Sequence, residues 1–359
     1  MRQRPFHLMA KPSASLCNIQ CEYCFYLEKP HQKQIKMHDE ILEKYIKQYI
    51  QSAPQSEITF IWQGGEPTLC GLDFFQRAVA LQQRYADKKI IRNSLQTNGI
   101  LLNDAWCRFF KAHDFLIGIS LDGTQPMHDV YRKNGRGKGT WKQVKSAVDL
   151  LQKHQVTFNI LTVVHNQNAD CGRELYLFLK SLGVNYMQFI PLMAAPEQQA
   201  SANAYGQFLI DVFDCWYQQD IGRISVQFIE QWLMAFFGYQ PSLCIFRPTC
   251  GDQMIIEQNG DIYSCDHYVY PQYKIGNIIE TPLIQITDST QQQKFGLAKQ
   301  HLSQKCRQCE FLFACHGGCP KHRTLLSETD YPHNYLCEAY YMALRHMAPY
   351  LKKLARKFG

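Results

Sequence analysis

Residues 6–26 read FHLMAKPSASLCNIQCEYCFY, a short apolar run followed by three cysteines with the spacing C-x3-C-x2-C. The cysteines are Cys17, Cys21 and Cys24. A [4Fe-4S] cluster normally takes four thiolates, so a loop with three leaves one iron open to a small molecule. A zinc knuckle or a chance group of buried thiols is the alternative, but short, ordered cysteine runs are typical of iron-sulfur ligands. The sequence therefore predicts a cluster with an open iron directly after the first strand.

The composition favours a large globular protein whose cysteines bind metal. The chain has 359 residues, of which 46% are hydrophobic, enough for two domains or for one barrel with an appendage. It has fifteen cysteines, yet its N-terminal stretch lacks the apolar segment of a signal peptide, and no apolar run is long enough to span a bilayer. We therefore expect a reducing, cytoplasmic location and no membrane partner. Clustered cysteines in such a compartment ligate metal more often than they form disulfides.

The charge is positive and spread along the chain. Lysine and arginine number 38 against 31 aspartates and glutamates, which gives a formal net charge of +7. There is no dense polybasic block apart from the modest tail LKKLARKFG, whereas nucleic-acid-binding proteins concentrate positive charge on one face. The pattern favours docking of an acidic protein and argues against a nucleic-acid partner.

Short apolar runs alternate with stretches of helical period, the pattern of repeated βα units around a parallel sheet. The candidate strands are residues 6–11, 57–62, 90–95, 115–121, 156–164 and 186–190. The candidate helices are residues 39–51, 72–86, 103–112, 140–153, 172–182, 204–218 and 226–237. Six strands predict an α/β fold with a partial (β/α)6 TIM-like barrel, whose active site lies at the carboxyl ends of the strands.

Polar segments follow the next strands. QGGEPT occupies residues 63–68, SLQTNG residues 94–99 and ISLDG residues 119–123. Paired glycines at a strand end allow the backbone to approach a ligand closely, although a plain turn has the same composition. Polar residues at strand ends are also ordinary caps and turns.

The cysteine loop and the GGEP segment together resemble the radical S-adenosylmethionine enzymes. The resemblance implies that the amino and carboxylate groups of S-adenosylmethionine fill the open iron site, with the GGEP segment supporting the amino group. It implies Ser120 as a cofactor contact and Arg132 as a partner of the cofactor carboxylate, because a guanidinium matches that group. The alternative for an arginine is a solvated surface position. The cofactor-binding residues implied in this way are Tyr23, Gly64, Gly65, Glu66, Pro67, Ser120 and Arg132.

The C-terminal part supplies eight more cysteines. Cys244, Cys250 and Cys265 precede the run CRQCEFLFACHGGC at residues 306–319, and Cys337 follows it. Eight thiolates complete two four-thiolate sites, and complete sites carry electrons or hold structure. A zinc ribbon at the first two cysteines of the run is the alternative.

This run and KIGNI at 274–278 resemble the SPASM domain of peptide-modifying radical enzymes. The resemblance implies a domain division into 1–235 (barrel), 236–337 (SPASM domain) and 338–359 (C-terminal helix). It also implies two auxiliary clusters, and hence three [4Fe-4S] clusters in all. The implied ligands of the first auxiliary cluster are Cys244, Cys250, Cys265 and Cys319. Those of the second are Cys306, Cys309, Cys315 and Cys337.

Four cysteines have no partner spacing. They are Cys70, Cys107, Cys171 and Cys215, and we interpret them as small buried apolar residues.

The wider pattern KPSASLCNIQCEYCFY, FIWQGGEPTLCGLDFF, NSLQTNG and YSCDHYV is similar to the anaerobic sulfatase-maturating enzymes. That resemblance implies oxidation of a cysteine or serine of a sulfatase to Cα-formylglycine. A 5′-deoxyadenosyl radical would remove hydrogen from the substrate Cβ, Asp266 would deprotonate the thiol or hydroxyl, and an auxiliary cluster would accept the electron. Without the resemblance, an aspartate beside a cysteine ligand is more simply a turn or cap residue.

The resemblance also implies substrate contacts and partners. Tyr26, Gln63 and Gln96 are the substrate-side candidates, with packing over the cluster as the alternative role of Tyr26. The implied substrate is an unfolded sulfatase polypeptide. Reduction of the open cluster needs a low-potential electron donor, and the excess positive charge suggests an acidic flavodoxin or ferredoxin as this partner. A different peptide maturase, forming thioether or carbon-carbon crosslinks, would share every cluster motif. The sequence leaves open the choice between serine and cysteine.

Overall fold

The computed structural model describes residues 4–28, 36–193, 195–326 and 330–358, and it divides the chain into two compact units. The first unit comprises residues 1–120, 132–158 and 251–296. The second comprises residues 121–131, 159–250 and 297–359. Each unit joins segments that are distant in sequence. The domain boundaries at residues 235 and 337 stay predictions.

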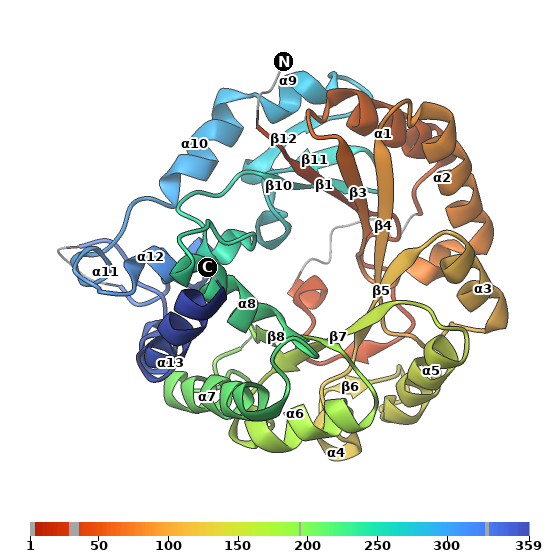
Figure 1. Cartoon of the computed structure of the whole chain (residues 1–359). Coiled ribbons are helices and arrows are strands. Elements are labelled where there is room, and N and C mark those ends of the chain that lie inside the picture. The colour runs from red at the N-terminus through yellow and green to blue at the C-terminus, as the bar shows by residue number, and fades with distance from the viewer. Residues whose placement is uncertain (1–3, 29–35, 194, 327–329, 359) are drawn as a thin grey trace. The chain divides into compact units, whose positions relative to one another are not determined.

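The first unit is built on a mainly parallel sheet with strand order β12-β11-β10-β1-β3-β4-β5 (Figure 1). The pairs β1–β10, β1–β3, β3–β4 and β4–β5 are parallel, while β10–β11 and β11–β12 are antiparallel. Its strands are β1 (His7–Lys11), β3 (Glu57–Trp62), β4 (Ile90–Thr97), β5 (Phe115–Ser120), β10 (Gln253–Glu257), β11 (Asp261–Tyr263) and β12 (Lys274–Asn277), and a separate two-stranded sheet joins β2 (Gln20–Cys21) and β6 (Arg132–Lys133).

Helices follow the strands of this unit as the βα pattern predicts. They are α1 (Asp39–Ser52), α2 (Leu72–Tyr85), α3 (Asp104–Ala112), α5 (Trp141–Lys153) and α9 (Leu283–Thr287), with α10 (Thr290–Ala298) crossing into the second unit and short 3-10 turns η1 (Phe25–Glu28), η2 (Pro67–Cys70), η5 (Asp266–Tyr268) and η6 (Pro271–Tyr273).

An aromatic cluster fixes α1 against the sheet. Phe60 and Trp62 are fully buried on one face of β3, because side chains two residues apart on a strand point the same way. Tyr45 of α1 packs edge-on against Trp62 at 5.8 Å between ring centroids. Its hydroxyl donates to the Leu8 carbonyl at 2.7 Å. Burial of each such ring contributes about 1.5–3 kcal/mol to the free energy of folding. The cluster therefore stabilises the packing of α1 on β1 and β3.

Strand β10 is an element that the sequence analysis missed. It runs parallel to β1 along the whole of that strand, from the pair His7–Gln253 to the pair Lys11–Glu257. Its residues Met254, Ile255 and Ile256 are buried. The run is only five residues long and lies among cysteines and glycines, so the sequence pattern predicts turns there and no strand. The strand brings the segment containing Cys265 and Asp266 into the first unit.

The second unit contains the remaining two predicted strands and the predicted helices beyond residue 172. Strands β7 (Phe158–Val164), β8 (Tyr186–Pro191) and β9 (Ser225–Val226) are parallel neighbours in that order. The helices are α4 (Gln125–Asp129), α6 (Gly172–Ser181), α7 (Ala202–Gln219), α8 (Gln227–Phe236), α11 (Gln304–Arg307), α12 (Leu312–Cys315) and α13 (Cys337–Phe358), with 3-10 turns η3 (Ala169–Cys171), η4 (Cys244–Phe246) and η7 (Pro320–His322). Helix α13 packs along α7 (Figure 1). All six strands predicted as βα units are therefore present.

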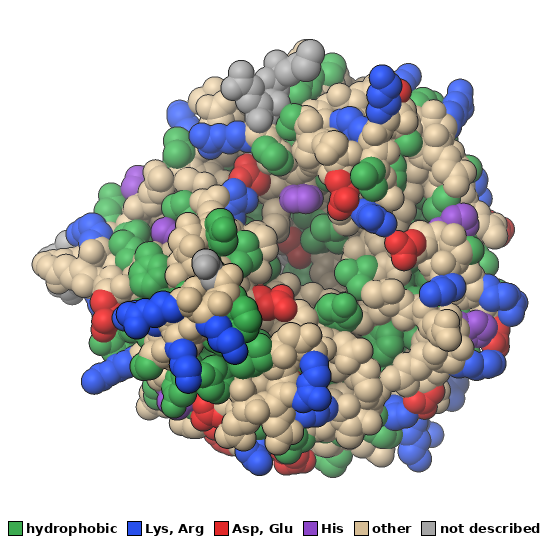
Figure 2. Space-filling model, in the orientation of Figure 1, with side chains coloured by type: hydrophobic (Ala, Val, Ile, Leu, Met, Phe, Trp, Pro, Cys, Tyr) green, Lys and Arg blue, Asp and Glu red, His purple; other side chains and the backbone are tan. Residues whose placement is uncertain are grey.

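The surface agrees with the diffuse charge of the sequence. Lysine and arginine side chains are scattered over the face in Figure 2 and mixed with acidic ones. None of the helices in the described part of the chain has the length and apolar character that crossing a bilayer requires.

Candidate active site

The loop after β1 holds the three predicted cluster cysteines together in the first unit. Cys21 lies on β2 and is buried, and the Cys24 amide donates to the Cys21 carbonyl at 3.0 Å. Burial raises the pKa of the Cys17 thiol to about 11, and the neighbouring Cys24 thiol adds to the rise. Thiols of this kind lose their protons when they bind metal, because only the thiolate is a ligand.

The glycine pair at the end of β3 touches the entry of this loop. The Gly65 amide donates to the Ala14 carbonyl at 2.7 Å, and the Glu66 amide donates to the Leu16 carbonyl at 2.8 Å. A Cβ at Gly65 would lie 2.2 Å from the Leu16 carbonyl oxygen. Gly64 has φ +136°, a conformation that residues with a side chain rarely adopt. Both glycines are therefore required by the close approach of the two loops.

Glu66 joins the ends of β3 and β4. Its buried carboxylate accepts hydrogen bonds from the Thr68 amide (3.0 Å), the Thr68 and Thr97 hydroxyls (2.6 and 2.8 Å) and the Asn98 amide (2.8 Å). Burial raises the pKa of Glu66, and these hydrogen bonds oppose the rise. Pro67 begins η2. The GGEP segment is thus tied to the SLQTNG segment through one side chain.

Arg132 lies against the cysteine loop and is not a solvated surface residue. It is 7% exposed, and it pairs with Cys21 in the β2–β6 ladder. Its guanidinium carbon lies 5.6 Å from the centre of the Tyr23 ring, and Nη1 approaches the Cys21 sulfur at 3.9 Å. Ser120, the last residue of β5, is also buried. The implied carboxylate partner therefore sits beside the predicted open cluster.

A polar network links Asp266 to the strand ends. Lys11, the last residue of β1, is fully buried, and its ammonium lies 2.6 Å from Oδ1 of Asp266. The same ammonium donates to Oε1 of Gln63, whose amide donates to Gln96 Oε1 at 2.6 Å. The structure thus brings three of the predicted residues together around a lysine.

Tyr26 borders this network. Its ring lies 5.7 Å from the Lys11 ammonium and packs on Phe25 at 4.4 Å between centroids. Burial raises the pKa of the Tyr26 hydroxyl well above its ordinary value, and the charges of Glu257 and Asp266 raise it further. The hydroxyl therefore stays protonated at physiological pH and can donate a hydrogen bond, but cannot act as a base.

Sequence reasoning missed Lys11 and Glu257. Both lie at the carboxyl ends of adjacent parallel strands, and they are 0% and 2% exposed. The signal for Lys11 was present, because a lysine ends the otherwise apolar strand FHLMAK at the edge of the sheet where the site lies. Glu257 could not be found, because its strand was not predicted.

The second unit contains two groups of cysteines. Burial raises the pKa of Cys315 to about 12, and the neighbouring thiols of Cys306, Cys337 and Cys309 raise it further. A second group forms around Cys250, whose pKa burial also raises to about 12, with Cys244 and Cys319 as neighbours that raise it. Cys265 belongs to the first unit, where it precedes η5.

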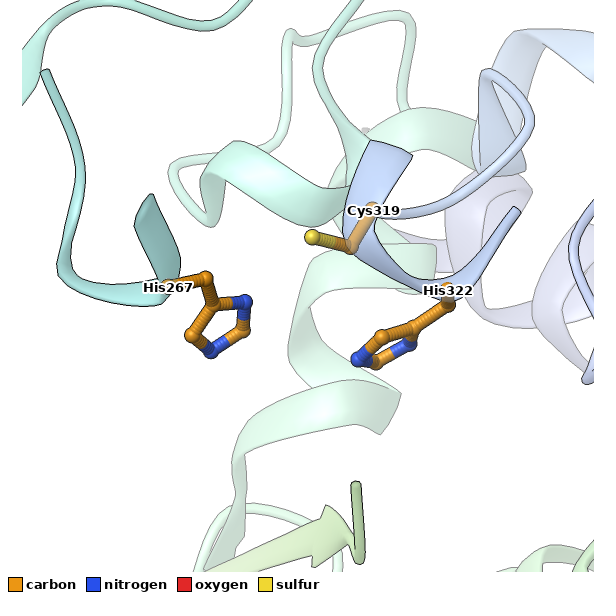
Figure 3. A group of neighbouring side chains, drawn as sticks. All are labelled: His267, Cys319 and His322. Carbon is orange, nitrogen blue, oxygen red and sulfur yellow. The ribbon is translucent and has the colours of Figure 1, made fainter. Parts of the chain in front are cut away.

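Turn η7 places a histidine beside one of these cysteines. Cys319 precedes the turn and His322 ends it, with their ligand atoms within 4.8 Å of each other (Figure 3). His322 is 4% exposed and was not singled out in the sequence.

The cysteines fit iron-sulfur clusters better than disulfides. All fifteen have free thiols. Iron-sulfur clusters need sets of three or four thiols, and these buried and half-buried cysteines supply such sets. Of the four cysteines without partner spacing, Cys107 and Cys215 are buried as predicted, whereas Cys70 and Cys171 are only half-buried.

Comparison with known proteins assigns the family. Residues 12–179 match the family model of the Radical SAM superfamily, and residues 244–310 match that of an iron-sulfur cluster-binding domain, SPASM. The serine-type anaerobic sulfatase-maturating enzyme of Bacteroides thetaiotaomicron is 39% identical over 375 residues, which cover 97% of this chain and 91% of that protein. The chain belongs to the anaerobic sulfatase-maturating enzymes. The cysteine-type enzyme of Clostridium perfringens is 32% identical over 98% of both chains.

The fold of this sulfatase-maturating enzyme also matches solved structures. Native anSMEcpe with bound AdoMet and Cp18Cys peptide aligns with a TM-score of 0.93 at 31% identity, over 99% of this chain and 100% of that one. Streptococcus suis SuiB aligns with a TM-score of 0.68 at 15% identity and shares the fold. The predicted α/β fold with a cysteine-rich SPASM domain is confirmed.

Family membership also confirms the predicted activity and cofactors. The chain is a radical enzyme that oxidises a cysteine or serine of a sulfatase to Cα-formylglycine. Its cofactors are [4Fe-4S] clusters, three in this family, and S-adenosylmethionine.

The glycine pair gives a first testable prediction. Gly65→Ala is expected to displace the cysteine loop, because its new Cβ would overlap the Leu16 carbonyl. After anaerobic reconstitution the variant should bind about four fewer irons per chain, the content of one cluster. Gly135→Ala is the control, since the nearest atom to a Cβ there is 3.8 Å away. Full iron content in the Gly65 variant would show that the loop tolerates the overlap.

Proposed function

We propose that Asp266 is the base of this oxidation and that Lys11, Gln63, Gln96 and Tyr26 hold the substrate side of the site. The observation that carries this proposal is the 2.6 Å ion pair between Asp266 and the fully buried Lys11. A carboxylate held by a buried cation has a fixed position, and general bases act only when they are positioned within hydrogen-bond reach of the proton.

The chemistry divides between the cofactor and these side chains. Bound S-adenosylmethionine supplies the radical that takes a hydrogen atom from the substrate Cβ. Asp266 accepts the proton of the substrate hydroxyl or thiol. An auxiliary cluster, held by the cysteines of the C-terminal part, would accept the released electron. The Tyr26 hydroxyl and the Gln63 amide would orient the reacting group. Carbon and oxygen or sulfur then form the double bond of the aldehyde or thioaldehyde. Water converts a thioaldehyde to formylglycine with release of hydrogen sulfide.

The cofactor contacts remain our assignments from the sequence, and the geometry supports them. Cys17, Cys21 and Cys24 would hold the open cluster, and the GGEP segment with Tyr23, Ser120 and Arg132 would bind S-adenosylmethionine. The proximity of Cys319 to Cys244 and Cys250 supports the first auxiliary ligand set, completed by Cys265. The proximity of Cys315 to Cys306, Cys309 and Cys337 supports the second.

We also propose that the enzyme accepts serine. The serine-type relative of Klebsiella pneumoniae is 40% identical over 98% of this chain, compared with 32% for the cysteine-type relatives. The test is an anaerobic assay with sulfatase peptides that differ only in serine, cysteine or alanine at the modified position, followed by product mass. Formylglycine from the serine peptide is the expected result. A crosslinked product would favour a different peptide maturase.

The positive charge of the chain is the basis for a proposed electron donor. The net charge of +7 and its scattered distribution favour docking of an acidic flavodoxin or ferredoxin. The cytoplasmic location and the absence of a nucleic-acid partner likewise remain predictions of the sequence.

Turnover with such a protein donor is expected to fall as salt increases. Exposed charges farther apart than about 10 Å are largely screened at 0.1 M ionic strength. Turnover with a small chemical reductant is the control and should change much less. Equal salt dependence with both reductants would exclude electrostatic docking.

A further inference from the structure

Lys299 is a buried cation beside the cysteine group formed by Cys244, Cys250 and Cys319. The residue is 1% exposed and follows α10 in the second unit. Its ammonium donates to the Cys244 carbonyl at 2.5 Å and to the Ile245 carbonyl at 3.0 Å. The amine is therefore anchored on the backbone of a predicted cluster ligand.

Arg323 is a second cation, and it lies near both cysteine groups, with Cys306 and Cys315 of one group and Cys250 and Cys319 of the other around it. Its Nη1 donates to the carbonyls of Lys299 and His301, both at 2.9 Å, and its other nitrogens donate to Gly317 and His316 carbonyls at 3.3 Å. The backbone thus fixes the guanidinium next to the segment that holds Lys299.

The ionisable groups around these two cations are cysteine thiols, which become thiolates only when they bind a cluster. Burial lowers the pKa of Lys299, and the charges of Cys250, Cys244 and Cys319 oppose that shift. Among the residues that the structure describes, the hydrogen-bond partners of Lys299 and Arg323 are backbone carbonyls, and neither side chain has a carboxylate partner. Burying a charge is costly unless an opposite charge lies close to it. The thiolates of a bound cluster supply that opposite charge.

We propose that Lys299 and Arg323 are fixed charges that raise the reduction potential of the auxiliary cluster held by Cys244, Cys250 and Cys319. An added electron makes a cluster more negative, so a nearby buried cation stabilises the reduced form more than the oxidised form. This role would make that cluster the favoured acceptor of the electron released from the substrate when Asp266 takes the proton. The role as electron acceptor rests on the proposed function. The reduction potential of the cluster can be measured without substrate.

The test is a redox titration followed by electron paramagnetic resonance, with iron content measured in parallel. The full chain with Cys17, Cys21 and Cys24 replaced is the background, so that only the auxiliary clusters contribute signal. Lys299→Gln and Lys299→Met both remove the charge, and glutamine can still donate a hydrogen bond. Each is expected to lower the reduction equilibrium constant of one auxiliary cluster by about tenfold, about 59 mV for a one-electron couple.

Lys305→Gln is the matched control. Lys305 lies near Cys306 and Cys337, but it is 52% exposed and pairs with Glu338. Its replacement should leave the potential of the Cys244 group unchanged.

A wild-type potential in Lys299→Gln would overturn the proposal, because the amine would then act only as a hydrogen-bond donor. Loss of the cluster in both Lys299→Gln and Arg323→Gln would overturn it as well, in favour of a structural role. Formylglycine is measured separately in Lys299→Gln with Cys17, Cys21 and Cys24 intact. A shifted potential with an unchanged rate of formylglycine formation would support the charge effect and refute this cluster as the acceptor of the substrate electron.

Discussion

Replacing Cys17, Cys21 and Cys24 together with alanine is expected to abolish the cleavage of S-adenosylmethionine while the rest of the protein stays folded. The three thiols are the predicted ligands of the open cluster, and the loop that carries them is held by backbone hydrogen bonds from the GGEP segment. After anaerobic reconstitution the iron content should fall from about twelve to about eight atoms per chain, since each cluster holds four. The measurements are iron and acid-labile sulfide per chain and the yield of 5′-deoxyadenosine.

Cys171→Ala is the control for this experiment. Cys171 is half-buried and has no cysteine neighbour among the causes of its raised pKa, which are burial followed by Glu174 and Asp170. Its replacement should leave both iron content and cleavage intact. Stoichiometric zinc with little iron in the anaerobically purified wild-type protein would contradict the assignment of all three clusters.

The strands of the βα units were predictable from sequence because each is an apolar run of ordinary length bounded by turn residues. The candidate strand 57–62 coincides with β3, whose alternate residues Ile58, Phe60 and Trp62 are buried. Strand β10 follows the same physics but pairs with β1, about 250 residues earlier in the chain. A single sequence contains no signal for so distant a pairing.

The site was predictable wherever residue type and spacing carry the chemistry. Cysteine spacing gave the loop at 17–24, but spacing alone could not place Cys319 with Cys244 and Cys250. That grouping depends on how the fold of the second unit brings Cys244 near Cys319. The same limit applies to Lys11, which is an ordinary basic residue until the fold buries it against Asp266.

For Gly65, the sequence indicates that a glycine matters but does not show the structural cause. The sequence suggested that the glycine lets the backbone approach a ligand. The structure adds a requirement within the protein, because the Leu16 carbonyl occupies the space that a side chain would need. The backbone of one loop therefore constrains the sequence of another.

Asp266→Asn is expected to separate radical formation from product formation. The asparagine has nearly the same shape but cannot accept the proton of the substrate hydroxyl or thiol. Cleavage of S-adenosylmethionine and removal of hydrogen from Cβ do not need the base, whereas completion of the oxidation does. General bases typically contribute about 10² to 10⁴ in rate, so formylglycine formation should fall by that factor. The measurements are 5′-deoxyadenosine, formylglycine and iron content in one anaerobic assay, with a Cβ-deuterated peptide to follow the hydrogen atom.

Asp261→Asn is the matched control, because it removes another carboxylate of the first unit that pairs with a lysine. Asp261 lies on β11, 2.5 Å from the Lys274 ammonium, and belongs to no predicted site. This variant should keep its formylglycine yield, while Asp266→Asn should keep three clusters and still transfer deuterium into 5′-deoxyadenosine. Near-normal formylglycine from Asp266→Asn would remove Asp266 from the catalytic residues. Loss of about four irons would instead make Asp266 a structural residue, because its neighbour Cys265 is a predicted cluster ligand. The ion pair with Lys11 would then hold that ligand in place.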